Sequence, residues 1–354
     1  MKPSHVSQRD IASKAGVSVS AVSLALRNHP KISPEVRARI QKIARRLGYR
    51  ADPKVAQLME HLRTARARRA PSKLAVIVPE LTAAQLKSYH PIMEMIAGAR
   101  EQAAEAGFEV DVFHLVSAGM TAGRLHTILR TRRIQGVFVA PFASGVGRLD
   151  FDFTGFAAAT AGYSIIEPLL HRSCPNYLQM MDETLEWVTR QGYRRVGFVL
   201  TYRPGGIGHK LFSSSFLYYQ NHIPAADRIP ILPKDEITDG RLLQWVQTYR
   251  PEVIISSGAI YRQLTNLGVP VPKKIKFANM DLSEPPQDAA GVDHRYRLVG
   301  RETVKLILSQ LLLNMTGLPD HPKIVLVDSH WRPGFTMPGN PSRNEARAAP
   351  LRQD

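Results

Sequence analysis

A glycine-rich segment at residues 205–210, Gly-Gly-Ile-Gly-His-Lys, is the stretch of this chain that most resembles a phosphate-binding loop. It lacks the G-x-x-x-x-G-K-[ST] spacing, because Lys210 is followed by Leu211. We therefore expect a mobile loop there. The segment Gly145-Val146-Gly147 is too short for the glycine pattern that binds dinucleotides. Neither stretch predicts a cofactor.

Cysteine and histidine, the usual ligands and nucleophiles, show no functional spacing. The single cysteine, Cys174, excludes an intramolecular disulfide and a cysteine-cluster metal site. It has His171 close in sequence, but a lone cysteine is more often inert than nucleophilic. The 12 histidines show no H-x-x-x-H or other ligand spacing. We expect no metal site and no active site, so the protein is not predicted to be an enzyme.

The net charge of +17 is concentrated at the start of the chain. Residues 1–73 carry 17 Lys and Arg against 4 Asp and Glu, a balance of +13, whereas the other 281 residues carry only +4. Lys and Arg that contact phosphates release condensed counterions, so a basic segment before a nearly neutral body is typical of nucleic-acid binding. A solubilising basic tail would show the same charge without ordered apolar spacing.

Apolar residues of the basic segment recur at helical spacing and predict three short helices. Ser7 and Asp10 have the form of a capping box before the first helix, which Gly16 ends, and Ser18 is the N-cap candidate of the second. Ser33 precedes the third helix. Two helices joined by a glycine-containing turn form a helix-turn-helix unit. The third helix is expected to bury Val36, Ile40, Ile43, Ala44 and Leu47.

The second helix of such a unit enters the major groove, and its N-terminal residues reach the base edges. Serines there can bond bases or phosphates, apolar side chains can touch thymine methyls, and an arginine can reach phosphate or guanine. A helix-turn-helix used only for packing is disfavoured, because the surrounding positive charge supplies phosphate attraction independently. The outward positions that we predict to contact DNA are Val19, Ser20, Ala21, Ser23, Leu24 and Arg27.

Residues 6–26 resemble the N-terminal DNA-binding domain of the lac repressor (LacI/GalR) family of transcriptional regulators. The family commonly carries arginine where this chain has Leu24, and leucine cannot make a bidentate guanine contact, so the operator sequence should differ from those of arginine-bearing members. The resemblance places Ser7, Ser18 and Asn28 among the DNA-binding residues. The matching residues are Asp10-Ile11-Ala12, Ala15-Gly16-Val17-Ser18, Ala21-Val22-Ser23 and, further on, Asn28 and Leu47-Gly48-Tyr49.

Residues 52–62 predict a short helix beginning at Asp52-Pro53, which would be marginal in isolation. By the resemblance, this segment is a hinge helix that orders on operator binding and pairs in the minor groove with its copy from a second subunit. Leu58 then matches the family's wedge leucine, which kinks the duplex. An ordinary linker helix with Leu58 tucked into the body is the alternative. Residues 63–71 are expected to be a flexible basic linker.

The pattern changes at residue 74, where strands and helices begin to alternate. A continuous apolar run at 74–78 is typical of a buried parallel strand, and a helix at 91–106, a strand at 108–115, a helix at 122–131 and a strand at 136–140 follow. The alternation restarts near residue 180. We therefore predict an α/β body of two lobes with doubly wound parallel sheets and a cleft at the carboxyl ends of the strands.

This body resembles the ligand-binding domain of the same family, which is related in fold to periplasmic sugar-binding proteins. The resemblance implies a first lobe at about 74–168 with a helix near 301–316. It also implies a second lobe at about 169–297 with the strand 323–327. Asp281 stands where the family often has a sugar-binding acid. Ser257 stands at the place of the usual Asn/Asp pair.

Two polar anchors of the family are absent or displaced. The segment that links the lobes has Tyr163 where many members have an aspartate, and residues 212–216, with Lys210 nearby, replace an Arg-x-x-Gly-Phe motif. The candidate effector contacts are therefore Tyr163, Lys210, Ser257 and Asp281. The missing anchors leave open a ligand other than a common hexose, or no ligand.

Taken together, the expected architecture is an N-terminal all-α helix-turn-helix head and a periplasmic-binding-protein-like body. The parts are a head at 1–51, a hinge helix and linker at 52–73, an effector-binding and dimerisation domain at 74–338 and a disordered tail at 339–354. No apolar run reaches the roughly 18 residues of a membrane span, and the first residues have no secretory pattern.

We expect a cytoplasmic, nucleoid-associated homodimer, most simply a repressor, that binds double-stranded operator DNA and a small molecule such as a carbohydrate. It needs no cofactor, metal or membrane. Two alternatives stay open. One is a cleft enzyme with an appended DNA anchor. The other is an architectural protein that binds DNA without sequence preference.

Overall fold

The computed structural model describes residues 8–26, 28, 31–47, 49, 72–202 and 206–338. The predicted hinge helix with Leu58, the linker, the tail, Ser7 and Arg27 lie outside these residues. Within the described part, no helix is long and apolar enough to cross a membrane.

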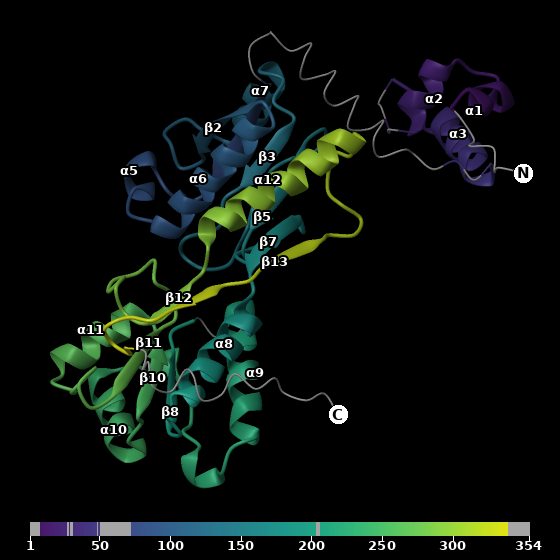
Figure 1. Ribbon diagram of the computed structural model, residues 1–354. Helices are drawn as coiled ribbons and strands as arrows, with labels where there is room; N and C mark the ends of the chain where they lie inside the picture. Colours follow the sequence, from purple (N-terminus) through teal and green to yellow (C-terminus); the bar gives the residue numbers. More distant parts are fainter. Residues whose placement is uncertain are drawn as a thin grey trace, which may run out of the picture.

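Three helices form the head, as predicted: α1 (Gln8–Ala15), α2 (Val19–Leu26) and α3 (Pro34–Arg46) (Figure 1). Ser18 Oγ accepts a hydrogen bond from the Ala21 amide at 3.2 Å, and Ser33 Oγ accepts one from the Val36 amide at 3.4 Å. Both serines therefore cap their helices. The small core of the head contains Ile11, Ala12, Ala15, Val22, Ala25, Ile40 and Ala44.

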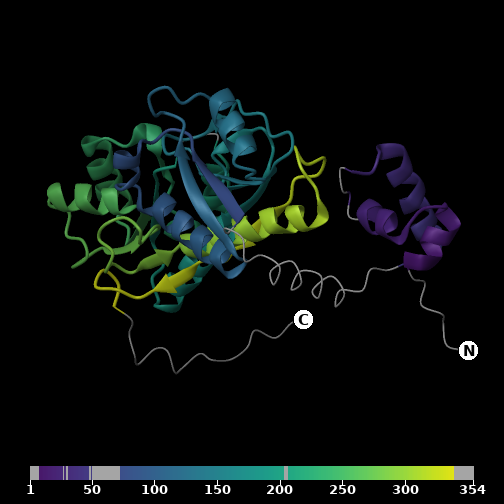
Figure 2. The same ribbon diagram turned by 90° about the horizontal axis from the view of Figure 1, so that it is seen from above.

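The first lobe is built on a six-stranded parallel sheet in the order β13-β7-β5-β3-β1-β2. Alternate residues of β1 face two different helix layers. Leu74 and Val76 pack with α6 and α12, whereas Ala75 and Ile77 pack with α7 on the other face. The course of the sheet and its helices can be followed in Figures 1 and 2. The strands are β1 (Ser72–Val78), β2 (Phe108–His114), β3 (Gly136–Val139), β5 (Ala157–Ala161), β7 (His171–Pro175) and β13 (Ile324–Val327), and the helices are α5 (Ala83–Leu86), α6 (His90–Glu105), α7 (Ala122–Thr131) and α12 (Tyr296–Leu313). A short pair, β4 (Gly147–Arg148) and β6 (Ile165–Glu167), stands apart from this sheet.

Two glycines let α6 and α12 approach closely. A Cβ atom on Gly98 would lie 1.8 Å from the Arg297 carbonyl oxygen, and one on Gly300 would lie 1.9 Å from the Met95 carbonyl oxygen. Because neither backbone can accommodate a side chain there, the start of α12 is held tightly against α6.

The second lobe has a six-stranded sheet in the order β14-β12-β11-β10-β8-β9, in which only β14 runs antiparallel to its neighbour. Helices α8 and α9 cover one face, and α10 and α11 cover the other. The strands are β8 (Val196–Leu200), β9 (Leu232–Pro233), β10 (Val253–Ser256), β11 (Lys276–Asn279), β12 (Gly291–Asp293) and β14 (His330–Arg332). The helices are α8 (Tyr177–Arg190), α9 (Ile207–Asn221), α10 (Asp239–Tyr249) and α11 (Gly258–Asn266).

The described chain passes between the lobes after β7, after β12 and after β13 (Figure 1). The lobe boundaries predicted from the sequence are therefore wrong at two places. The strand at 323–327 belongs to the first lobe, because Ile324 of β13 pairs with Arg172 of β7. For the same reason the first lobe extends to Pro175 rather than ending at 168. An apolar run shows that a strand is buried, but not which sheet it joins.

The prediction of a loop at 205–210 is wrong for residues 207–210, because α9 begins at Ile207 with Gly206 as its N-cap. Phe212 and Phe216 lie four residues apart on this helix and are both fully buried against α8 and β8. Their burial stabilises a helix despite the glycines and serines around them.

Candidate nucleic-acid interface and effector pocket

Helix α2 presents the predicted base-reading positions on its open side. Val19 is 43% exposed, and Ala21, Ser23 and Leu24 are partly exposed. On the opposite side, Val22 is fully buried in the head core. Ser20 lies in α2 as well, but its side chain, like Ser7 and Arg27, is outside the described part. The four described positions are therefore placed as a groove-reading surface requires.

Asn28 has a structural task in the head. Its backbone is left-handed, with φ of 57°, and its Oδ1 atom accepts a hydrogen bond from Gln41 Nε2 at 2.8 Å. The same Gln41 nitrogen donates to the Ala25 carbonyl oxygen at 3.1 Å. Asn28 thus links the end of α2 to α3. Because its Oδ1 atom is engaged, the side chain could contact DNA through the N–H groups of its amide.

The described head carries many more cations than acidic residues. Arg37 and Arg39 also brace the head, since they donate to the Ile32 and Ala15 carbonyl oxygens at 3.0 and 3.3 Å. The acidic residues of the described head are Asp10 and Glu35. The exposed cations of the described head are Arg9, Lys14, Lys31, Arg39, Lys42, Arg45 and Arg46. This charge favours binding to the phosphates of a duplex.

A cavity of about 380 Å³ lies between the two lobes. The first lobe contributes the start of α6, and the second lobe contributes the loop after β11 and part of β14. The segment from β12 into α12 completes it. The lining residues are His90, Glu94, Asp281, Leu282, Ser283, Gln287, Asp293, His294, Arg295, Tyr296, Arg297 and Arg332.

Asp281, the predicted sugar-binding acid, lines this cavity and is already engaged. Its Oδ2 atom accepts a hydrogen bond from the Tyr296 hydroxyl at 2.7 Å, and its Oδ1 atom accepts one from the Ser283 amide at 2.8 Å. Burial, together with the neighbouring Asp281 carboxylate, raises the pKa of Tyr296 well above its ordinary range. The tyrosine therefore stays a neutral donor at physiological pH.

Aromatic rings from both lobes meet beside Asp281. The centroid distances are 6.0 Å for Tyr163–Tyr177, 5.0 Å for Tyr177–Phe212 and 4.9 Å for His294–Tyr296. Burial, and to a lesser extent Cys174, raises the pKa of Tyr163 to about 12. Tyr163 thus lies at the interlobe cluster, where the sequence predicted a ligand contact, although it does not line the cavity itself.

The remaining two predicted contacts are further removed. Ser257 is the N-cap residue of α11 at the end of β10, and its Oγ atom is buried without a hydrogen-bond partner in the described structure. Lys210 is exposed on α9. Neither residue lines the cavity. His294, Arg295 and Arg332 line the cavity and were not predicted from the sequence, although the first two directly follow the short strand β12.

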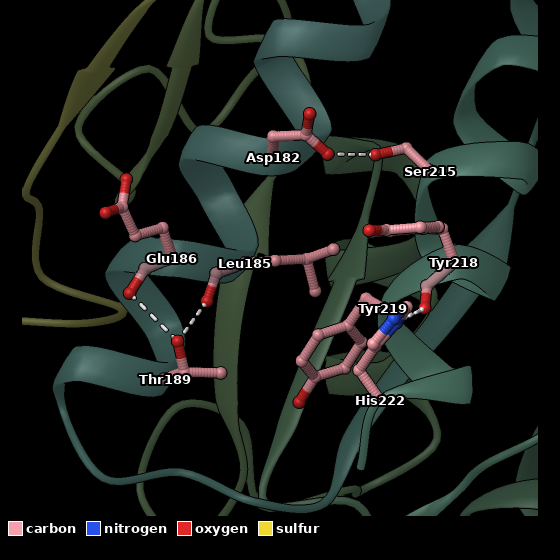
Figure 3. A pocket seen from close by; sticks show the side chains of 8 residues that line it. All are labelled: Asp182, Leu185, Glu186, Thr189, Ser215, Tyr218, Tyr219 and His222. Carbon is pink, nitrogen blue, oxygen red and sulfur yellow. Dashed lines mark hydrogen bonds between the residues drawn. The ribbon is translucent and has the colours of Figure 1, made fainter. Parts of the chain in front are cut away.

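A second hollow of about 260 Å³ lies between α8 and α9 (Figure 3). Its polar groups are used within the two helices: Ser215 donates to Asp182, and the Thr189 hydroxyl bonds the Leu185 carbonyl oxygen at 2.8 Å. It is remote from the strand ends that meet between the lobes. No group of His, Cys, Asp and Glu in the described ranges is arranged to hold a metal ion.

The chain thus combines a three-helix head containing a helix-turn-helix unit with a two-lobed α/β body that has a cavity between its lobes. Residues 8–52 match the family of bacterial regulatory proteins of the lacI type. The predicted resemblance is confirmed in the head, which carries the sequence signature of this family. No curated protein matches the chain significantly in sequence.

Solved structures share the two-part architecture at low sequence identity. The transcriptional regulator CelR in complex with cellobiose is 14% identical, with a TM-score of 0.52 over 94% of this chain and 99% of that one. The lac repressor dimer bound to operator and an anti-inducer is 16% identical, with a TM-score of 0.50 over 94% and 99%.

The LacI-family regulator CCPA of Weissella paramesenteroides, solved with glucose, is 14% identical, with a TM-score of 0.51 over 75% of this chain and 98% of that one. At these identities the likenesses establish the fold. They confirm the predicted head and two-lobed α/β body.

Proposed function

We propose that the protein is a sequence-specific DNA-binding transcriptional regulator, most simply a repressor, controlled by a small molecule bound between its lobes. The observation that carries this proposal is the pairing of a lacI-type head with an interlobe cavity at the carboxyl ends of parallel strands, where α/β proteins bind ligands. The sugar complexes of CelR and CCPA support a carbohydrate or a carbohydrate derivative as effector.

The protein acts as a homodimer on a near-palindromic operator. The lac repressor structure, a dimer on operator DNA, supports this assembly. Two heads related by two-fold symmetry would bind half-sites about one helical turn apart. The segment around Leu58, which lies outside the described residues, would act as the minor-groove wedge.

Effector control follows from the contact between Asp281 and Tyr296. A ligand that binds Asp281 competes with the tyrosine hydroxyl and so changes how the second lobe meets the start of α12. Because the segments that follow β7, β12 and β13 all pass between the lobes, this contact would influence the angle between the lobes. Effector and operator then bias one two-state element from separate sites, and their coupling is reciprocal.

We propose no catalytic role, and we place the protein in the cytoplasm with the nucleoid. Turnover of a sugar or nucleotide by the purified protein would favour the alternative of a cleft enzyme with a DNA anchor.

Selection of genomic DNA fragments by the purified full chain tests the function. The affinities of the protein for the most enriched sequence and for a scrambled duplex are then compared at about 150 mM salt, where phosphate contacts alone give weak binding. We expect at least about 1,000-fold preference for the selected sequence. Equal affinity for the two duplexes would favour an architectural protein instead.

A further inference from the structure

We propose that the interlobe cavity takes a hydroxylated anion, that is, a sugar phosphate or a sugar carboxylate. The inference rests on the proposed function, since it names the chemical class of the effector. Guanidinium groups, two helix N-termini and unpaired polar atoms at the cavity support it.

Two arginines of the cavity have no acidic partner within the part of the chain that the structure describes. Arg295 and Arg332 are exposed, and neither has a carboxylate at ion-pair distance anywhere in the described chain. Arg297 differs, because its side chain lies 3.1 Å from Glu94 and 3.3 Å from Glu101. A guanidinium group presents planar donors that match phosphate and carboxylate oxygens in pairs. Arg295 and Arg332 are therefore available for an anionic ligand.

The carboxylates that line the cavity do not pair with the guanidinium groups of Arg295 or Arg332. Each accepts hydrogen bonds from, or forms an ion pair with, another group close by. Glu94 pairs with Arg297, and Asp281 accepts hydrogen bonds from Tyr296 and Ser283. Asp293 Oδ1 accepts a hydrogen bond from the Arg295 amide at 2.8 Å, which positions the backbone of that arginine.

Two long helices begin at the cavity without side-chain caps. Helix α6 has 16 residues and starts at His90, and α12 has 18 residues and starts at Tyr296. Neither N-cap side chain bonds the first turn, whereas Thr121 and Asn176 cap α7 and α8. The first-turn amides and the positive end of each helix dipole favour an anion at this place.

The N-cap residue of α12 strengthens the inference. It is Arg295, held in the left-handed conformation with φ of 53°. A cation at the positive end of a helix dipole is unfavourable, and left-handed backbone is costly for a residue other than glycine. A bound anion between the guanidinium and the helix end compensates for this arrangement.

Buried polar atoms indicate that the ligand also carries hydroxyl groups. His294 is 1% exposed, and its Nε2 atom donates to the Met280 carbonyl oxygen at 2.6 Å. In the tautomer that carries its single proton on Nε2, the Nδ1 atom is a hydrogen-bond acceptor. Among the described residues, Nδ1 has no hydrogen-bond partner, and neither has Ser283 Oγ. Both residues line the cavity. A ligand hydroxyl can donate to Nδ1, and the serine can bond a second one.

Calorimetric titration of the full-length protein tests the proposal with four probes: glucose 6-phosphate, gluconate, inorganic phosphate and glucose. We expect glucose 6-phosphate or gluconate to bind at least about 10-fold more tightly than glucose. Preference for glucose 6-phosphate together with binding of inorganic phosphate identifies a phosphate group, and preference for gluconate identifies a carboxylate. Equal affinity of glucose and both anionic sugars, or binding of none of the anions, overturns the proposal.

Matched variants make the test specific. Arg295→Ala and Arg332→Ala are each expected to weaken binding of the preferred anion by about 10-fold or more. Arg241→Ala removes an exposed arginine that is paired with Glu236 on the second lobe, and it should leave binding unchanged. Equal loss in all three variants would contradict the assignment.

Operator binding by the same preparation separates the two proposals. A protein that binds its operator but prefers neutral glucose retains the proposed function and loses this inference. A protein that binds no specific DNA but takes the anionic sugar through Arg295 loses the proposed function alone.

Discussion

The hydroxyl of Tyr296 donates a hydrogen bond to Oδ2 of Asp281 at 2.7 Å and so joins the two lobes. Tyr296 begins α12, which packs in the first lobe, whereas Asp281 follows β11 of the second. The pair occupies the wall of the interlobe cavity.

Replacing the tyrosine isolates that contact. Tyr296→Phe removes one hydrogen bond to a charged acceptor, and we expect the free energy of unfolding to fall by about 1–2 kcal/mol. It should also tighten binding of the effector, because Asp281 no longer has to release the hydroxyl. Urea unfolding and calorimetry measure the two effects.

Tyr219→Phe is the matched control for that variant. The Tyr219 hydroxyl is buried without a hydrogen-bond partner in the described structure, so its removal should be neutral or slightly stabilising. Equal destabilisation by the two variants would contradict the role given to the Asp281 contact.

The crossing of α6 and α12 is expected to tolerate no side chain at its glycines. Gly98→Ala places a Cβ atom against the Arg297 carbonyl oxygen, and the shift that this forces should cost about 1–3 kcal/mol in thermal or urea unfolding. Gly123→Ala, in α7, has nothing within 4 Å of its Cβ atom and should stabilise the protein by about 0.5–1 kcal/mol. Similar effects of the two substitutions would refute the close crossing.

Base preference is expected to depend on Leu24. Leu24→Arg should introduce a guanine preference worth about 1–3 kcal/mol at one operator position, as seen by selection among randomised duplexes. Ser13→Arg adds the same charge at an exposed site of α1. It should raise affinity for all duplexes alike and steepen the salt dependence. If Leu24→Arg behaves in the same uniform way, α2 does not read bases.

His171 predicts a loss of stability in mild acid. Burial, and then Lys323, lowers its pKa below the ordinary 6.5, and its Nδ1 atom accepts a hydrogen bond from the Lys323 amide at 3.0 Å. The unfolded chain binds the proton more readily, so this contribution is complete above pH 6.5 and is lost as pH falls toward the folded pKa.

Unfolding of the wild-type protein and His171→Gln between about pH 5 and 8 measures this effect. The wild-type protein should lose more stability than the variant on acidification. Identical pH profiles would show that protonation of His171 does not destabilise the pairing of β7 with β13.

Local signals made the head predictable, and long-range pairing limited what could be predicted for the body. Ser18 and Ser33 cap their helices by accepting hydrogen bonds from amides three residues further on, so nearby sequence is enough to predict their role. The placement of β13 beside β7 depends on a partner strand about 150 positions earlier in the chain. The apolar residues of β13 do not indicate which strand it will pair with.

The candidate site shows the same division. The sequence predicted an acid at Asp281. Its partner Tyr296 and the arginines at 295 and 332 come close to it only because the chain passes between the lobes after β12 and again after β13. Helix α9 escaped prediction because glycines and serines hide the paired burial of Phe212 and Phe216. Tertiary packing overrides helix propensity there.

The hinge prediction concerns DNA shape. Leu58→Ala should weaken operator affinity and reduce DNA bending, measured by electrophoretic mobility of circularly permuted duplexes, while the protein stays dimeric. Unchanged bending would remove the wedge assignment and favour the linker-helix alternative.

Reciprocal titration is the most direct measurement of whether the interlobe pocket steers the head. Operator affinity is determined with and without saturating effector, and effector affinity with and without operator. The two factors should be equal and lie at about 5- to 150-fold, in whichever direction the effector acts. Affinities that are independent of each other would show that the two sites are not coupled.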